Sequence, residues 1–115
     1  MESKNLAKLI ANYSLEKKAE DVIILNLSDI TTITDYFVIC SADSTAQVKA
    51  ITDFVTEKLK EQNIKTWHTE GYESLKWVLL DFVDVVVHVF QPETRKFYGL
   101  EKLWGDAEII KVEDK

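Results

Sequence analysis

Two neighbouring apolar segments, residues 75–82 and 84–90, restrict the fold of this chain more than any other feature of its sequence. Both are rich in Val, Leu and aromatic residues, and only Val83 separates them. Segments of this length and composition, joined so tightly, are typical of an antiparallel β-hairpin. Both faces of the first strand are largely apolar. Either helices therefore cover both faces of the sheet, or one face is an exposed apolar surface.

The other segments alternate between helical and extended patterns. Ser44 or Thr45 can cap a long helix, Pro92 suits the first turn of another, and Gly105 can end it. Helices are expected at residues 4–18, 45–62 and 92–104, a loop at 28–34, and strands or extended segments at 21–27, 35–41, 64–69 and 107–112. We therefore expect an α/β fold with one mixed β-sheet flanked by helices, in a single domain over residues 1–115.

Charge and composition limit the partner and the compartment. The chain has 14 Lys and Arg against 20 Asp and Glu, a net charge of −6. Nucleic acid phosphates repel such a chain, so a basic protein is the better candidate partner. The single cysteine, Cys40, excludes an intrachain disulfide, and no apolar run approaches the roughly 20 residues that span a bilayer. With no signal or transit pattern at the N-terminus, these features predict a cytoplasmic protein without membrane association.

Three aspartates are candidate metal ligands or catalytic residues. Asp81 and Asp84 flank the expected hairpin turn, and Asp35 begins a strand, so together they could bind a divalent cation for nucleotidyl transfer. Asp also favours turns and strand ends because its side chain accepts bonds from nearby backbone N–H groups, and we favour this explanation. No glycine precedes Gly71, so the first half has no glycine-rich phosphate loop.

The histidines and the cysteine do not form a recognisable metal or nucleophile motif. His68, His88 and Cys40 lie on three different expected strands and lack the paired spacing of zinc ligands. Cys40 lies inside an apolar strand, where a thiol is inert. We expect no metal, no cofactor and no catalytic residue. His88 shares a sheet face with residues 86 and 90 and is a candidate hydrogen-bonded histidine at an interface.

Aromatic residues are concentrated in the second half of the chain. They are Trp67, Trp77, Phe82, Phe90, Phe97, Tyr98 and Trp104. A core of this size can hardly enclose all of them, and exposed apolar patches usually mark protein partners. For Trp77, burial beneath a helix is an equally good alternative.

Several motifs together resemble one family. In the first half they are residues 34–39 (TDYFVI), Ser44 and residues 47–48. In the second half they are Glu70-Gly71, residues 77–81 (WVLLD), residues 84–90 (DVVVHVF), and Arg95, Phe97, Tyr98, Leu100, Glu101, Leu103 and Trp104. In order and spacing, residues 5–107 resemble the ribosomal silencing factor family, RsfS or Iojap.

The resemblance implies a specific function. It implies a fold related to nucleotidyltransferases but without their catalytic signature, and therefore no enzyme activity. It also implies binding to the large ribosomal subunit through the ribosomal protein numbered fourteen, which blocks joining of the small subunit and represses translation when nutrients are short. Family members tend to form homodimers. A divergent nucleotide-binding or nucleotidyl-transfer enzyme is the alternative, and a scaffold whose aromatic patch only forms the dimer is a third hypothesis.

On this basis we predict a partner-binding surface. Its apolar centre is Trp77, Leu79, Tyr98, Leu100 and Trp104, with Asp81 and Glu101 at the rim and His88 at the interface. At one position the chain departs from the family, which usually has glycine where Val83 stands. A turn that requires positive φ would strain a valine at that position.

Overall fold

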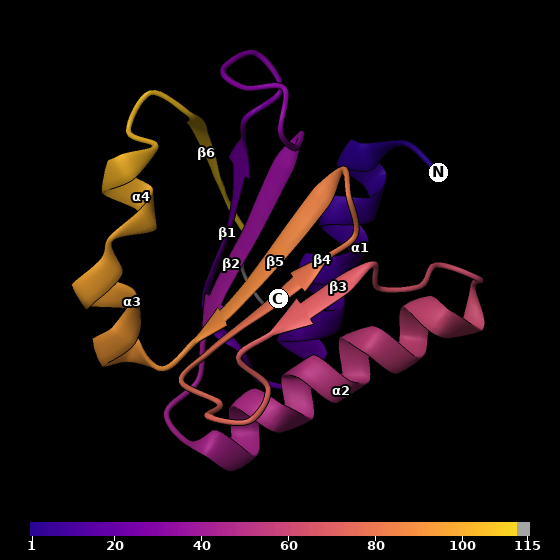
Figure 1. Ribbon diagram of the computed structural model, residues 1–115, viewed down its shortest axis with the longest axis vertical. Coiled ribbons are helices and arrows are strands. Elements are labelled where there is room, and N and C mark those ends of the chain that lie inside the picture. The colour runs from indigo at the N-terminus through magenta and orange to yellow at the C-terminus, as the bar shows by residue number, and fades with distance from the viewer. Residues whose placement is uncertain (113–115) are drawn as a thin grey trace.

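A six-stranded mixed sheet forms the centre of the molecule in the computed structural model, which describes residues 1–112 (Figure 1). The elements in chain order are α1 (Ser3–Glu16), β1 (Glu20–Asn26), β2 (Tyr36–Ser41), α2 (Thr45–Glu61), β3 (His68–Glu70), β4 (Trp77–Asp81), β5 (Val85–Phe90), α3 (Pro92–Tyr98), α4 (Leu100–Leu103) and β6 (Glu108–Lys111). The strand order is β3-β4-β5-β2-β1-β6. Only β2 and β5 pair in parallel among these neighbours. The predicted α/β fold with a mixed sheet between helices is confirmed.

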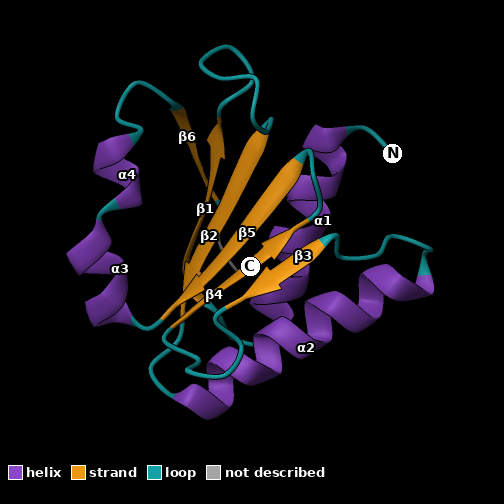
Figure 2. Cartoon of the chain, in the orientation of Figure 1, coloured by secondary structure: helices purple, strands orange, loops and turns teal. Residues whose placement is uncertain are grey.

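The two long helices cover one face of the sheet, and α3 and α4 lie on the other side (Figure 2). The apolar stripe of α2 begins after Ser44, whose Oγ accepts a bond of 3.1 Å from the Gln47 N–H, as expected of a cap. Val48, Ile51, Val55 and Leu59 then point into the core and are fully buried. They pack with α1 against alternate residues of β1, β2, β4 and β5, which form the main core.

The helices α3 and α4 cover only part of the opposite face. Leu100 packs there on a smaller core of Ile23, Leu25, Leu27, Ile39, Phe90 and Ala107. Strand β4 shows the difference between the two faces directly. Val78 and Leu80 are buried under the long helices, whereas Trp77, Leu79 and Asp81 on the other face stay half-buried. Part of this face is therefore open to a partner.

Two expected elements differ from the structure. The predicted strand at residues 64–69 is wrong in extent, because only His68–Glu70 forms β3. Asn63 adopts φ 64° at the end of α2, and the Ile64 N–H bonds back to the Leu59 carbonyl at 2.9 Å. These contacts hold the start of the segment against the helix rather than in the sheet.

The single helix predicted for residues 92–104 is also wrong. Gly99 adopts the left-handed conformation, with φ 56° and ψ 49°, and separates α3 from α4. Its N–H bonds to the Arg95 carbonyl at 2.9 Å, which is the usual way for glycine to end a helix. Apolar side chains continue beyond the break, so the sequence pattern did not reveal it.

The β4–β5 hairpin is antiparallel, as predicted. The Phe82 N–H bonds to the Val85 carbonyl at 2.9 Å, and Val83 between them has φ 75°. This is the left-handed region, in which a β-branched residue is strained. No helix within residues 1–112 has the length and hydrophobicity needed to cross a membrane.

Candidate protein-binding surface

Trp77 lies at the centre of the open part of the sheet. Register places it opposite Phe90 of β5, and the two rings stack with centroids 4.8 Å apart and an interplanar angle of 27°. Tyr98 of α3 approaches the Trp77 ring to the same centroid distance, 4.8 Å. Two distant parts of the sequence, β4 and α3, thus meet at this ring. Trp77 is half-buried, so neither burial under a helix nor full exposure describes it.

Two hollows adjoin the Trp77 ring. The larger, about 550 Å³, is lined by Ser74, Lys76, Trp77, Glu93, Thr94, Phe97 and Tyr98. The smaller, about 310 Å³, is lined by Glu70, Gly71, Trp77 and Leu79. Trp77 is the residue that the two hollows share. Each hollow carries one carboxylate, from Glu93 or Glu70, beside apolar surface, and the larger hollow also carries the ammonium group of Lys76. A carboxylate beside apolar surface suits the long apolar stem and charged end of a Lys or Arg side chain.

Aromatic side chains extend this surface onto α3. Phe97 is 81% exposed and Tyr98 54% exposed, and their rings meet edge to face at 5.0 Å. We call Trp77, Leu79, Phe97 and Tyr98 the aromatic face. Exposed aromatic side chains next to hollows are typical of a protein-binding surface.

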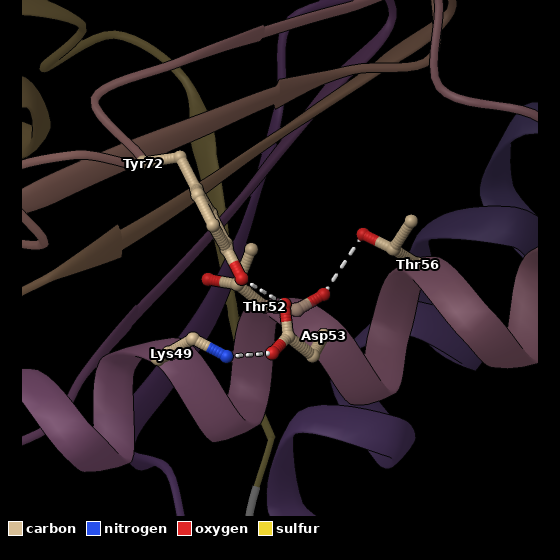
Figure 3. Close-up of polar contacts among 5 residues, drawn as sticks. All are labelled: Lys49, Thr52, Asp53, Thr56 and Tyr72. Carbon is tan, nitrogen blue, oxygen red and sulfur yellow. Dashed lines mark hydrogen bonds and ion pairs between the residues drawn. The ribbon is translucent and has the colours of Figure 1, made fainter.

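The loop between β3 and β4 forms one edge of the aromatic face and is fixed to α2 (Figure 3). The Tyr72 hydroxyl of this loop donates to Asp53 Oδ1 at 2.7 Å. Lys49 Nζ donates to Asp53 Oδ2 at 2.8 Å, and this bond raises the pKa of Lys49. The Thr56 hydroxyl donates to the Thr52 carbonyl at 2.8 Å on the next turn of the same helix. The bonds to Asp53 hold the loop, and with it the start of β4, in place before any partner binds.

His88 lies beneath Trp77 rather than on the surface. Its side chain is almost completely buried, with 3% exposed, and its Nδ1 accepts a bond of 3.0 Å from Trp77 Nε1. Burial lowers the pKa of His88 to about 3, so the imidazole is neutral at physiological pH. With so little exposed area, His88 cannot contact a partner directly in this conformation.

The other predicted site residues are distributed over three places. Leu79 and Tyr98 join Trp77, whereas Leu100, in α4, is buried against the sheet with 9% exposed. Trp104 is half-buried and its ring meets Phe37 edge to face at 6.0 Å. Leu100 therefore supports the surface rather than forming it.

The two predicted rim carboxylates already have partners within the chain. Glu101 Oε2 accepts from Arg95 Nε at 3.3 Å, and Arg95 Nη1 donates to the Asp21 carbonyl at 2.9 Å and to Ser41 Oγ at 2.8 Å. Arg95 thus ties α3 and α4 to the sheet. Asp81 lies at the far end of β4 from Trp77, where its Oδ1 accepts from the Val83 N–H at 2.7 Å.

Comparison with known proteins decides the family. The sequence model described as ribosomal silencing factor during starvation, RsfS, matches residues 1–115. The chain belongs to this family. Ribosomal silencing factor RsfS of Halalkalibacterium halodurans is 45% identical over 113 residues, covering 98% of this chain and 97% of that protein. RsfS of Bacillus subtilis is 40% identical over 113 residues, covering 98% and 96%.

A solved structure extends the RsfS comparison to the fold. The crystal structure of a Chromobacterium violaceum protein matches with a TM-score of 0.88 at 40% identity, covering 91% of this chain and 88% of that one. The resemblance noted in the sequence is thereby confirmed at the level of the family. Kinship with nucleotidyltransferases stays a prediction.

In this RsfS-family chain, one of the three candidate catalytic aspartates, Asp81, has a structural role for its side chain. Asp81 accepts from the turn backbone, and the Asp84 carbonyl accepts from the N–H groups of Asp35 and Tyr36 at 2.9 and 3.2 Å. Within the described residues, no three His, Cys, Asp or Glu side chains gather as they would around a metal ion. Burial raises the pKa of the Cys40 thiol to about 12, which leaves it unreactive. The structure therefore favours a turn role for the Asp81 side chain, whereas Asp84 and Asp35 are joined through backbone atoms.

Sequence reasoning did not assign Phe97 or Gly71 to the RsfS surface. Phe97 is among the most exposed large apolar residues, yet sequence alone does not show which side of a short helix faces solvent. Gly71 lines the smaller hollow and has φ 80°. The position of this glycine immediately before a tight loop was the one sequence feature that could have indicated its role.

Proposed function

We propose that this RsfS-family protein represses translation by binding the large ribosomal subunit and occupying space that the small subunit needs. The partner is the ribosomal protein numbered fourteen, contacted through the aromatic face, with little direct contact to RNA. The mechanism is steric, so no bond is made or broken and no cofactor is required. The protein acts in the cytoplasm, and the free form is a homodimer.

One observation carries the proposal: Trp77 is held half-exposed, stacked on Phe90, and lines two hollows. A rigid aromatic ring gives a large contact area at low entropic cost, and such residues dominate binding energy at interfaces. Completing the burial of one such side chain contributes about 1 to 3 kcal/mol. Phe97 and Tyr98 add further apolar area beside it.

Charge supports a basic partner. The chain carries a net charge of −6, so long-range attraction speeds its encounter with a basic protein surface. Glu70 and Glu93 are exposed and line the two hollows, one each. They replace Asp81 and Glu101 as our candidates for direct contacts to Lys or Arg of the partner, because those two carboxylates are half-buried and bond within the chain. Glu70 Oε2 lies 3.3 Å from His68 Nε2, but 64% of the Glu70 side chain stays exposed.

The experiment is co-sedimentation with purified large ribosomal subunits in a sucrose gradient. Wild type is expected to migrate with the subunits, and Trp77→Ala is expected to remain at the top. Trp67→Ala is the matched control, because Trp67 is 73% exposed but lines neither hollow. Wild-type protein that stays at the top of the gradient would overturn the proposal.

The same variants separate ribosome binding from dimer formation. If the aromatic face served only the homodimer, Trp77→Ala would be a monomer that still binds large subunits. We expect instead that Trp77→Ala loses large-subunit binding whatever its oligomeric state. Light scattering of the free variants supplies that state.

A further inference from the structure

His88 is a polar residue in an apolar environment. It lies between Val86 and Phe90 on the inward part of the open face and is 3% exposed. Its ring meets Phe37 at 4.5 Å with an interplanar angle of 69° and lies 5.9 Å from the ring of Trp77. By size and surroundings, an apolar side chain would suit this position.

The hydrogen bonding of His88 is half complete. Nδ1 accepts from Trp77 Nε1 at 3.0 Å, so the proton of the neutral ring is on Nε2. Nε2 is buried and has no hydrogen-bond partner among residues 1–112. A buried donor without an acceptor destabilises a fold, whereas an apolar residue of similar shape would avoid that cost. The histidine is therefore poorly explained by folding alone.

We propose that His88 is a positioning residue for Trp77: it holds the indole ring in its partner-binding orientation at a cost to the fold. This rests on the function proposed above. The bond from Trp77 Nε1 ties the free edge of the indole to the sheet, and stacking on Phe90 holds its flat face. With both constraints the ring stays fixed beside the hollows that Trp77 lines before a partner binds. Removing rotamer freedom in advance increases affinity.

A matched pair of substitutions tests this inference. Asn and Leu have nearly the same size and branching, but only Asn places an acceptor, Oδ1, near the position of His88 Nδ1. His88→Leu should bind large subunits about fivefold to tenfold more weakly than wild type, the loss expected for one hydrogen bond. His88→Asn should bind within about twofold of wild type, by the same reasoning.

Thermal unfolding should rank the two variants in the opposite order, with the weaker binder being the more stable. A buried amide costs more than a buried isobutyl group, so His88→Leu should melt at a higher temperature than His88→Asn. If His88 served only the fold, binding would follow stability and the Leu variant would bind at least as well. Stronger binding by the less stable Asn variant is the result that supports positioning.

The indole N–H of Trp77 gives a readout that does not need the ribosome. Its NMR resonance is assigned by its loss in Trp77→Phe, since the chain has three tryptophans. Exchange of this proton with water should be slow in wild type and His88→Asn, and fast in His88→Leu. Equal protection in His88→Leu and wild type would overturn the positioning role.

These experiments also distinguish a failure of the proposed function from a failure of the inference about His88. If wild type fails to bind large subunits, the proposed function is wrong, and the indole exchange still decides whether His88 positions Trp77. If wild type binds and both His88 variants bind equally well, the function stands and the inference about His88 is wrong.

Discussion

The backbone of Gly71 lies directly against the Trp77 carbonyl: a Cβ on residue 71 would stand 1.9 Å from that oxygen. Gly71 also has φ 80°, so a side chain there meets both a clash and a disfavoured conformation. This close approach sets the path of the β3–β4 loop into the first residue of β4. The aromatic face therefore depends on a glycine that contributes no side chain to it.

Gly71→Ala should destabilise the fold by more than the roughly 1 kcal/mol that positive φ alone costs a residue with a side chain. Gly99→Ala is the control, because Gly99 has φ 56° but the nearest atom to an added Cβ is 3.9 Å away. Urea unfolding of both variants separates the clash from the backbone strain. Equal losses in the two variants would show that the loop moves freely away from residue 71.

Val83→Gly should stabilise the protein by about 0.5 to 1 kcal/mol. Val83 has φ 75° in the hairpin turn and is 55% exposed, so glycine relieves strain and removes little buried surface. The gain is reduced because glycine has more freedom in the unfolded chain. The midpoint of urea unfolding measures it, and a lower midpoint for Val83→Gly would contradict the strained turn.

Arg95→Met should destabilise the fold by about 3 kcal/mol, because it leaves Glu101 without its partner and removes the bonds to Asp21 and Ser41. The side chain of Arg95 is 11% exposed, so water cannot easily replace those bonds. Lys96→Met, at the exposed neighbouring position, is the control and should change stability by less than about 0.5 kcal/mol. Similar effects of the two substitutions would show that the Arg95 bonds do not hold α3 and α4.

Stability should fall as the pH is lowered from 7 to 5, in part because of His88. Its pKa is about 3 in the fold and about 6.5 when unfolded, so the unfolded state gains a proton over this range and the folded state does not. This linkage amounts to about 2 kcal/mol between pH 7 and pH 5. His88→Leu should lose that part of the pH dependence. If the free energy of unfolding depended on pH in the same way for wild type and the variant, the claim that His88 is buried and neutral would be contradicted.

Much of the fold could be predicted from local patterns. The stripe on α2, its Ser44 cap and the hairpin around Val83 each depend on neighbouring residues, and the sequence contains them. The limits of β3 could not be predicted in this way, because a three-residue edge strand is defined by its pairing with β4. The break at Gly99 was missed because helical periodicity continues through it.

The site was only partly predictable. The alternation of side chains along a strand assigns each residue to one face of the sheet, but it does not show which parts of that face other elements cover. Trp77 and His88 share a face, yet one is half-exposed and the other is buried beneath it. That difference depends on tertiary packing, because the rings of Phe37, Trp77 and Phe90 lie around His88. Phe97 was missed because sequence alone does not show which side of a short helix faces solvent.

The most direct test of the central claim is the joining of purified ribosomal subunits in the presence of this protein. Wild type is expected to lower the fraction of joined ribosomes in a sucrose gradient, and Trp67→Ala is expected to do the same. A folded Trp77→Ala variant should leave that fraction close to its value without added protein. Subunits that join equally well with and without wild-type protein would contradict the account.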